Sequence, residues 1–493
     1  MTLITMILMI AAIALVWTAI VAFGFRAHKN LLISYLQSFT GALFVFSGAV
    51  KAIDPLGTAY KMEQYFTQFE YTLQGTWFSF FAPIFPKLSD ASATFSVVMI
   101  TFEIVLGVML LIGARPKVSA WLFFLLVVFF TILTGFTFLT GYVPAEVNFF
   151  EFGKWGAYQA SNMKVTDCGC FGDFMKLEPK ISFMKDLVLL VPAFIFLFAS
   201  KQMHRILTPL TRSAIVWITT IGTVIYCLSN YVWNLPDVDF RPFREGRNIA
   251  EIKMQEEEAA NNVKTVSYIL TNKESGEVIN LPYEDYMKKF ADYPKEKWSF
   301  EPIKTEPAIP ATKISEFDIQ DEDGNSMTED ILAEPGYSIM IVAHEITSLE
   351  TIVTTTVVDS IYIVDTVKIA GTDSVTLVKK LEKLSPKEVS TAQYSFDEDY
   401  VKYYTEKVNP LMEAAEKAGW KVYMVTAYAE PAYIESFRHA AQTAYPVYQA
   451  DDILLKTIIR SNPGVVIWKG GTILKHYHIK RLPSPEKVLE KYK

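Results

Sequence analysis

The sequence predicts a membrane-embedded bundle of six α-helices followed by a water-soluble α/β domain. Of the 493 residues, those up to about Trp233 are mostly Leu, Ile, Val, Phe and Ala, and after Pro236 the chain becomes charged and rich in Lys and Glu. A chain of this length exceeds one compact domain. We therefore expect a membrane domain over 1–233, a linker and small α+β segment over 234–310, and a soluble domain over 311–493.

Six apolar stretches are each long enough to cross a membrane, because a bilayer core about 30 Å thick needs roughly 20 apolar residues of helix. They are residues 2–23, 31–53, 93–113, 119–139, 181–200 and 213–232. The first stretch is expected to be a retained helix and not a cleaved signal peptide, because its basic residues follow the apolar run instead of preceding it.

Basic residues gather in alternate loops, which predicts the orientation of the chain. They occupy the loops after the first, third and fifth stretches, and the positive-inside rule places these loops in the cytoplasm. The residues are Arg26, Lys29, Arg115, Lys117, Lys201, Arg205 and Arg212. We therefore expect a multi-pass protein of the bacterial inner membrane with its C-terminal domain in the periplasm. A net charge of −7 argues against a nucleic-acid partner, so the expected contacts are membrane lipid and a protein client or envelope complex.

The soluble half alternates strands and helices. A continuous apolar run over 337–343 predicts a buried strand, and the Thr- and Val-rich segment 351–378 predicts an inserted hairpin. Helices are expected over 401–418, 434–443 and 453–460, with a strand over 421–426 and a last hairpin over 464–478. This order predicts an α/β sandwich of thioredoxin type, in which Pro463 is expected to be cis because it directly precedes the hairpin. His476 and His478 share one face of that hairpin and are interpreted as surface histidines.

All three cysteines are predicted to lie on the extracytoplasmic side, where disulfides persist: Cys168, Cys170 and Cys227. Cys168 and Cys170, separated by one glycine, can close a strained and therefore labile disulfide. Asp167 and Asp173 flank the pair and oppose thiolate formation unless a cation such as Lys51 lies nearby.

Several interpretations of the cysteines remain open. The pair can be a redox centre, a structural disulfide, two buried thiols or part of a metal site, although zinc is disfavoured because a second ligand pair is missing. Cys227 can resolve a mixed disulfide, or it can be a small apolar residue of its helix.

Charged residues at the predicted membrane helices are further candidates. Glu103 falls near the middle of its helix, where an ionisable group is expensive, and we expect it to pair with Gln37 or Ser47 or to handle protons. Lys51, Asp54 and Asp186 are predicted at the outer ends of two helices, where they either hold the cysteine loop or form a solvated rim.

Two stretches of the membrane half resemble the MauE/DoxX family of bacterial membrane proteins. They are residues 44–55 (FVFSGAVKAIDP) and residues 167–172 (DCGCFG). The resemblance covers about residues 31–200 and implies a DoxX-like four-helix core formed by the second to fifth apolar stretches. MauE is associated with maturation of methylamine dehydrogenase, a disulfide-rich periplasmic enzyme, and DoxX relatives with sulfur or quinone oxidoreduction. The resemblance therefore implies a link to methylamine utilisation or thiol chemistry, with a quinone as candidate cofactor.

Residues 311–493 resemble thioredoxin-like and peroxiredoxin-like domains, with one departure. Those domains carry redox cysteines just after the first core strand, where this chain reads AHEITSL over 343–349, and no cysteine follows Cys227. The soluble domain therefore cannot exchange thiols by itself. A six-helix DoxX-like region joined to such a domain is similar to an uncharacterised group of Bacteroidota proteins, a resemblance that implies architecture more than function.

Three functions agree with these observations. The preferred hypothesis is a membrane component of an extracytoplasmic thiol–disulfide or protein-maturation system, in which Cys168 and Cys170 carry electrons as a thiol–disulfide oxidoreductase. The alternatives are a non-catalytic scaffold of an envelope complex and a quinone-linked oxidoreductase subunit that uses Glu103.

Overall fold

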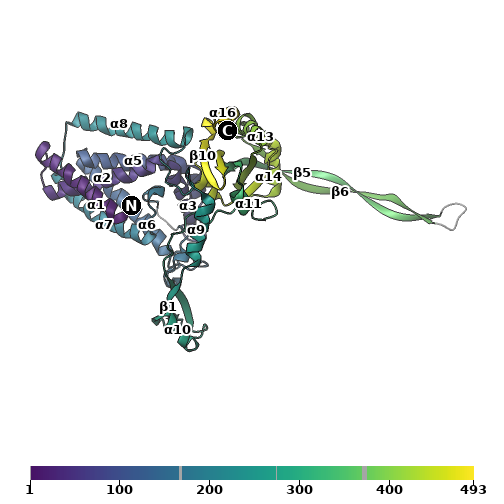
Figure 1. Ribbon diagram of the computed structural model, residues 1–493. Helices are drawn as coiled ribbons and strands as arrows, with labels where there is room; N and C mark the ends of the chain where they lie inside the picture. The colour runs from purple at the N-terminus through teal and green to yellow at the C-terminus, as the bar shows by residue number, and fades with distance from the viewer. Residues whose placement is uncertain (1, 166–168, 274, 369–374, 493) are drawn as a thin grey trace. The chain divides into compact units, whose positions relative to one another are not determined.

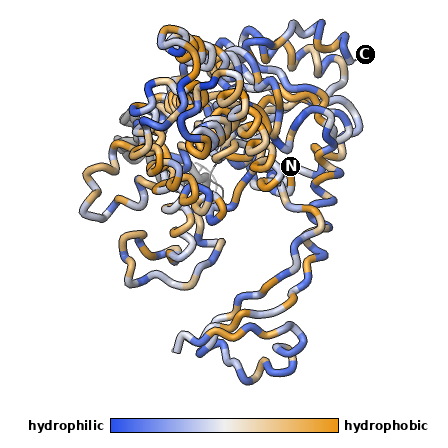
Figure 2. The backbone as a smooth tube through the Cα atoms, turned by 90° about the vertical axis from the view of Figure 1, so that its left-hand side faces the viewer, coloured by the Kyte–Doolittle hydropathy of each residue, from blue (hydrophilic) through white to orange (hydrophobic). Residues whose placement is uncertain are grey.

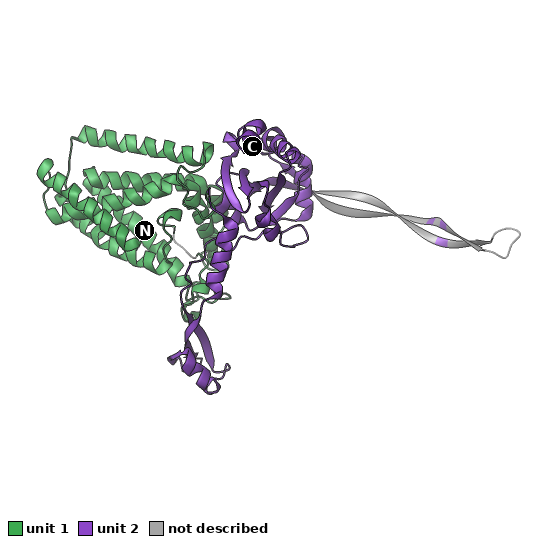
Figure 3. Ribbon diagram, viewed as in Figure 1, with its two compact units in different colours: residues 1–244 green, residues 245–493 purple. Residues whose placement is uncertain are grey.

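A computed structural model describes residues 2–165, 169–273, 275–368 and 375–492. The chain divides into two compact units, Met1–Arg244 and Glu245–Lys493, which Figure 3 shows in different colours. Unit 1 is helical, and unit 2 contains both helices and strands (Figure 1).

Six helices of the described residues are long and apolar enough to cross a membrane, which confirms a multi-pass membrane protein. Figure 2 colours the backbone by hydropathy and shows hydrophobic and hydrophilic residues along the chain. The first and last helices each continue into a short π-helical segment, η1 (Ile20–Gly24) and η7 (Ser229–Trp233). The helices are α1 (Leu3–Ala19), α2 (Leu31–Ile53), α5 (Ser92–Ile112), α6 (Pro116–Thr140), α7 (Pro179–Ala199) and α8 (Pro209–Leu228).

Glycines let α2 and α5 pack unusually close together. A Cβ atom built on Gly107 of α5 would lie 2.8 Å from the carbonyl oxygen of Gly41, and one on Gly48 would lie 2.4 Å from the side chain of Ile104. Small residues at helix contacts allow backbones to approach closely inside a membrane, where packing replaces the hydrophobic effect as the driving force. The close contact aligns the C-terminal part of α2 with the middle of α5.

Two further helices, α3 (Pro55–Leu73) and α4 (Ile84–Asp90), follow α2 between the second and third apolar stretches, where no helix was predicted. Asp54 caps α3 by accepting the backbone N–H of Gly57 at 3.0 Å, and Pro55 takes the first helical position, where a missing N–H is harmless. Ser96 of α5 donates to the carbonyl of Pro55 at 2.7 Å, so α3 begins beside α5. These bonds place α3 along one wall of the bundle.

Unit 2 begins with helix α9 (Ile249–Asn261) and a three-stranded sheet of order β2-β1-β3. Its strands are β1 (Thr265–Asn272), β2 (Val278–Pro282) and β3 (Trp298–Lys304). Helix α10 (Tyr283–Lys289) lies between β2 and β3 in the chain. Both pairings are antiparallel.

A five-stranded mixed sheet forms the core of the second unit, with the order β10-β9-β4-β7-β8. Strands β4, β7 and β8 run parallel, and β9 and β10 run antiparallel to their neighbours. The strands are β4 (Tyr337–Ala343), β7 (Lys421–Ala427), β8 (Val447–Ala450), β9 (Gly464–Lys469) and β10 (Thr472–His478). The flanking helices are α11 (Thr328–Ala333), α12 (Glu398–Tyr403), α13 (Asn409–Lys417), α14 (Pro431–Ala441), α15 (Asp452–Ile458) and α16 (Pro485–Lys491). This mixed α/β architecture is consistent with a thioredoxin-like domain, and the Asn462–Pro463 bond is cis.

Two segments of this domain differ in detail from the sequence prediction. The inserted hairpin is longer than expected, because β5 (Ser348–Lys368) pairs antiparallel with β6 (Val375–Phe396). The single helix expected over 401–418 is broken by a π-helical segment, η9 (Tyr404–Val408), before α13. Pro410 follows this segment and has no backbone N–H to continue an α-helical ladder, which explains the interruption.

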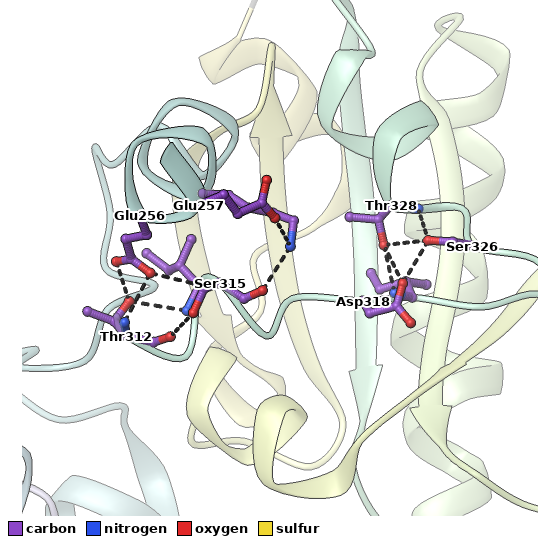
Figure 4. A network of polar contacts seen from close by, with 10 residues as sticks. Glu256, Glu257, Thr312, Ser315, Asp318, Ser326 and Thr328 are labelled. Carbon is purple, nitrogen blue, oxygen red and sulfur yellow. Dashed lines mark hydrogen bonds and ion pairs between the residues drawn. The ribbon is translucent and has the colours of Figure 1, made fainter. Parts of the chain in front are cut away.

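A buried carboxylate joins α9 to the chain that leads into the five-stranded sheet (Figure 4). Glu256 is 2% exposed and accepts three hydrogen bonds, from the backbone N–H of Thr312 (3.0 Å), its hydroxyl (2.8 Å) and the N–H of Ser315 (3.1 Å). The neighbouring Glu257 instead forms an ion pair with Lys253 at 3.0 Å and is half exposed. Nearby, the hydroxyl of Ser326 holds the pKa of Asp318 below its usual value.

We predict that Glu256→Ala destabilises this junction by about 2–4 kcal/mol, because three donors to a charged acceptor lose their partner. Hydrogen exchange followed by mass spectrometry should show faster exchange over α9 and residues 311–316. Glu257→Ala is the matched control and should change exchange little, since an exposed ion pair contributes at most about 1 kcal/mol. Equal effects of the two substitutions would contradict this role of Glu256.

Candidate functional site

A pocket inside unit 1 brings together the charged membrane residues and one cysteine. Its walls come from α2, α3, α5, α6, α7 and the loop before α7. Ten of the twenty lining residues are polar or charged, and the others are apolar or glycine. The polar lining residues are Ser47, Lys51, Thr58, Lys61, Tyr65, Glu103, Thr134, Cys170, Lys185 and Asp186.

Lys51 and Glu103 form a buried ion pair across the α2–α5 contact. Lys51 Nζ lies 2.6 Å from Glu103 Oε2, and the side chains are 6% and 3% exposed. The ammonium group also lies 5.5 Å from the centre of the Phe130 ring on α6. A charge in a membrane helix needs such a partner, because an unpaired ion there is strongly disfavoured.

The structure therefore corrects the expected partners of Glu103. Gln37 donates to the carbonyl of Leu110 at 2.7 Å and accepts the N–H of His204 at 3.0 Å. Ser47 donates to the carbonyl of Cys170 at 2.9 Å. Lys51 lies in the last turn of α2, as expected, and the close approach of α2 and α5 brings it to Glu103.

A second ion pair lies on the α7 wall. Lys185 Nζ is 2.7 Å from Asp186 Oδ1, and Thr134 of α6 donates to Asp186 Oδ2 at 2.9 Å. Asp186 is 1% exposed, and Lys185 also reaches to 6.0 Å from the centre of the Phe171 ring. Sequence analysis named Asp186 but overlooked Lys185 and Thr134, although adjacent opposite charges within an apolar stretch are a usable signal.

The cysteine loop closes one side of the pocket. The bond from Ser47 to the Cys170 carbonyl fixes the loop to α2, and the buried Phe171 packs 6.3 Å from the ring of Phe46. Gly169 has φ +59°, a backbone conformation that favours glycine. A Cβ atom at this position would lie 3.0 Å from the side chain of Lys61, so the loop lies close against α3.

Other predicted residues lie outside this pocket lining or outside the described residues. Cys168 and Asp167 fall in the segment that the structure does not describe, so the pairing of Cys168 with Cys170 stays a prediction. Asp173 lies in the 3-10 turn η5 (Gly172–Phe174), and Asp54 caps α3. Cys227 is fully buried against Ala52, Val97 and Ile100. No disulfide joins the two described cysteines, Cys170 and Cys227.

In unit 2, the place after β4 is filled by polar and aromatic side chains. The amide of Asn462 donates to the carbonyl of Glu345 at 2.6 Å, and the hydroxyl of Tyr400 donates to Asn462 Oδ1 at 3.1 Å. Burial, reinforced by the charges of Lys456 and Arg460, lowers the pKa of His344 to about 3, so this imidazole is neutral at physiological pH.

The two histidines of the last hairpin are not surface residues. His476 and His478 are 4% and 6% exposed, which corrects the sequence interpretation. The β9–β10 hairpin is covered by the start of unit 2, where Glu245 accepts the backbone N–H of His476 at 3.1 Å. Within the described parts of the chain, no group of three or more His, Cys, Asp or Glu side chains is arranged to hold a metal ion.

Comparison with known proteins agrees with the membrane half of this description. Residues 29–144 match the family model for methylamine utilisation protein MauE. The chain is MauE-like over this segment. The matched segment contains Lys51, Glu103 and Thr134 and ends before the cysteine loop. No curated protein and no solved structure matches the chain significantly.

We predict that Glu103→Gln destabilises the membrane unit by about 3–5 kcal/mol, because it leaves Lys51 as an unpaired buried charge. Heat-induced loss of the monodisperse protein in detergent measures the change. The Lys51→Gln/Glu103→Gln double variant should recover much of the loss, since neither charge then remains alone. Glu146→Gln, in an exposed part of an extramembrane loop, serves as the control. A neutral Glu103→Gln variant would show that the pair does not stabilise the bundle.

Proposed function

We propose that the protein is a membrane component of an extracytoplasmic thiol–disulfide system that matures other proteins, with Cys168 and Cys170 as its redox pair. The observation that supports this most is the position of Cys170. Its loop is tied to α2 and forms part of a pocket that also holds the Lys51–Glu103 and Lys185–Asp186 pairs. Positive groups beside a thiol favour the reactive thiolate.

The chemistry of the pair is disulfide exchange. A client thiolate attacks one sulfur of the Cys168–Cys170 disulfide, and the other sulfur leaves as a thiolate. A second client thiolate then attacks the mixed disulfide, which leaves the client oxidised and the pair reduced by two electrons. A lipid-soluble quinone is our candidate acceptor for these two electrons and two protons, because the pocket lies within membrane-spanning helices.

The α/β domain takes a binding role in this proposal. It contains no cysteine, and tyrosine and asparagine side chains fill the place after β4. A domain of this kind can hold a client or an envelope partner while the chemistry takes place at the membrane unit. The likeness to MauE, whose family is named for methylamine utilisation, supports an accessory role in maturation.

We also propose that the protein lies in the inner membrane with the α/β domain in the periplasm, as the basic loops indicate. A reporter enzyme that folds only after export, fused behind Lys493, is expected to be active. A reporter that works only in the cytoplasm should be inactive at the same position. The reverse pattern would overturn the orientation and, with it, the oxidising environment that the cysteine pair requires.

The redox proposal predicts a mixed population of oxidised and reduced Cys168–Cys170 in living cells. Acid quenching followed by a heavy maleimide separates the two forms by gel mobility, and blocking quinone oxidation should increase the reduced form. Cys170→Ser or Cys168→Ser should trap a client as a mixed disulfide, whereas Cys227→Ser is the matched control and should behave as wild type. A pair that stays oxidised under every condition, together with a functional double Ser variant, would instead indicate a scaffold.

A further inference from the structure

Lys185 brings a positive charge to the cysteine side of the pocket. Its ammonium group lies 6.0 Å from the centre of the ring of Phe171, the residue that follows Cys170. Lys185 and Cys170 line the same pocket. The side chain is 17% exposed, so solvent screens its charge only in part.

Asp186 of α7 holds this ammonium group in place, and Thr134 of α6 in turn holds Asp186. Asp186 Oδ1 accepts from Lys185, and Asp186 Oδ2 accepts from Thr134 at 2.9 Å. Because both carboxylate oxygens are engaged and Asp186 is almost completely buried, its position is fixed from α6 and α7 together. A fixed carboxylate in turn restricts the long and otherwise flexible lysine side chain.

The structure shows a polar partner for each of the other two lysines of the pocket. Lys51, which sequence analysis considered as the cation near the cysteines, lies 2.6 Å from Glu103 and faces the Phe130 ring. Lys61 touches the loop with its aliphatic stem at Gly169, but its Nζ donates to Gln64 of its own helix at 2.9 Å.

We propose that Lys185 is a positioning residue that stabilises the thiolate of Cys170, with Asp186 and Thr134 orienting its ammonium group. A thiolate that loses water contacts is disfavoured unless a cation is nearby, and the ammonium supplies that cation. The proton released from Cys170 passes to the extracytoplasmic solvent. This inference deepens the proposed function, because the thiolate is the attacking form in disulfide exchange.

Other titratable groups line the same pocket. Asp186 comes from α7, and Lys51, Lys61, Tyr65 and Glu103 come from α2, α3 and α5. Asp173 follows Cys170 by three residues, in the turn η5. Neutralising Lys185 changes the local charge by one unit and leaves the carboxylates in place. The thiolate should then become less stable.

The test uses the full-length protein with Cys168→Ser and Cys227→Ser, which leaves Cys170 as its sole cysteine. In lipid nanodiscs, the rates of modification by an anionic and a cationic methanethiosulfonate of similar size are measured over a range of pH. The ratio of the two rates reports the local charge, because changes in accessibility affect both reagents alike.

Lys185→Met is expected to lower the anionic-to-cationic rate ratio about tenfold and to move half-maximal reactivity about one pH unit higher. Lys185→Arg keeps the charge and should preserve both values. Lys180→Met, an exposed residue in the first turn of the same helix, is the matched control and should change neither. Thr134→Val should give a smaller change in the same direction, because Asp186 loses one of its partners.

An unchanged ratio and pH profile in Lys185→Met would overturn the inference. If that variant does not accumulate, Lys185→Gln and Thr134→Val decide the question by the same two readouts. A protein with one cysteine cannot form the internal disulfide, so this result is independent of whether Cys168 and Cys170 cycle in cells. The two proposals can therefore fail separately.

Discussion

The close packing of α2 against α5 is the contact on which the membrane unit depends. Gly41, Gly48 and Gly107 leave no room for side chains at the contact, so the two backbones meet directly. This approach sets the register that brings Lys51 to Glu103, and both charges can then remain inside a membrane-spanning bundle. A larger residue at any of the three positions would separate the helices and expose the ion pair to unfavourable surroundings.

The same contact supports the candidate site. Ser47 lies on α2 between Gly48 and the helix centre, and its hydroxyl ties the Cys170 carbonyl to that helix. On the opposite wall, α6 and α7 contribute Thr134, Lys185 and Asp186. The cysteine loop is thus held against a pocket whose charges are fixed in pairs. Buried ion pairs add little net stability, so their persistence here agrees with a functional role for the pocket.

Much of this architecture could be predicted from the sequence. The lengths of the apolar stretches predicted the six membrane helices, because a helix buried in lipid must be apolar over its whole span. The alternation of predicted strands and helices indicated the mixed α/β domain, because burial in a core imposes such patterns on the sequence. Helix α3 was not predicted, since it is too polar to resemble a membrane helix, although an Asp-Pro pair marks its start.

The pairings within the site were harder to predict. Glu103 was assigned to Gln37 or Ser47, because a helical repeat does not show which of several polar residues on the neighbouring helix is level with it. The register depends on the glycine contacts, which become evident only when the two helices are placed together. Lys185 could have been noticed beside Asp186 in an apolar stretch, but its distance to the Phe171 ring is evident only in the structure. The contact of the last hairpin with Glu245, whose carboxylate accepts the backbone N–H of His476, joins residues more than 200 positions apart in the sequence.

The central claim is that the membrane unit holds a reactive cysteine pair. The most direct measurement is the reduction potential of the Cys168–Cys170 couple in the purified protein in nanodiscs, equilibrated against glutathione or dithiothreitol buffers. Our account predicts a reversible two-electron transition between about −270 and −120 mV, the range of thiol–disulfide oxidoreductases. A potential below about −300 mV, typical of structural disulfides, would contradict it.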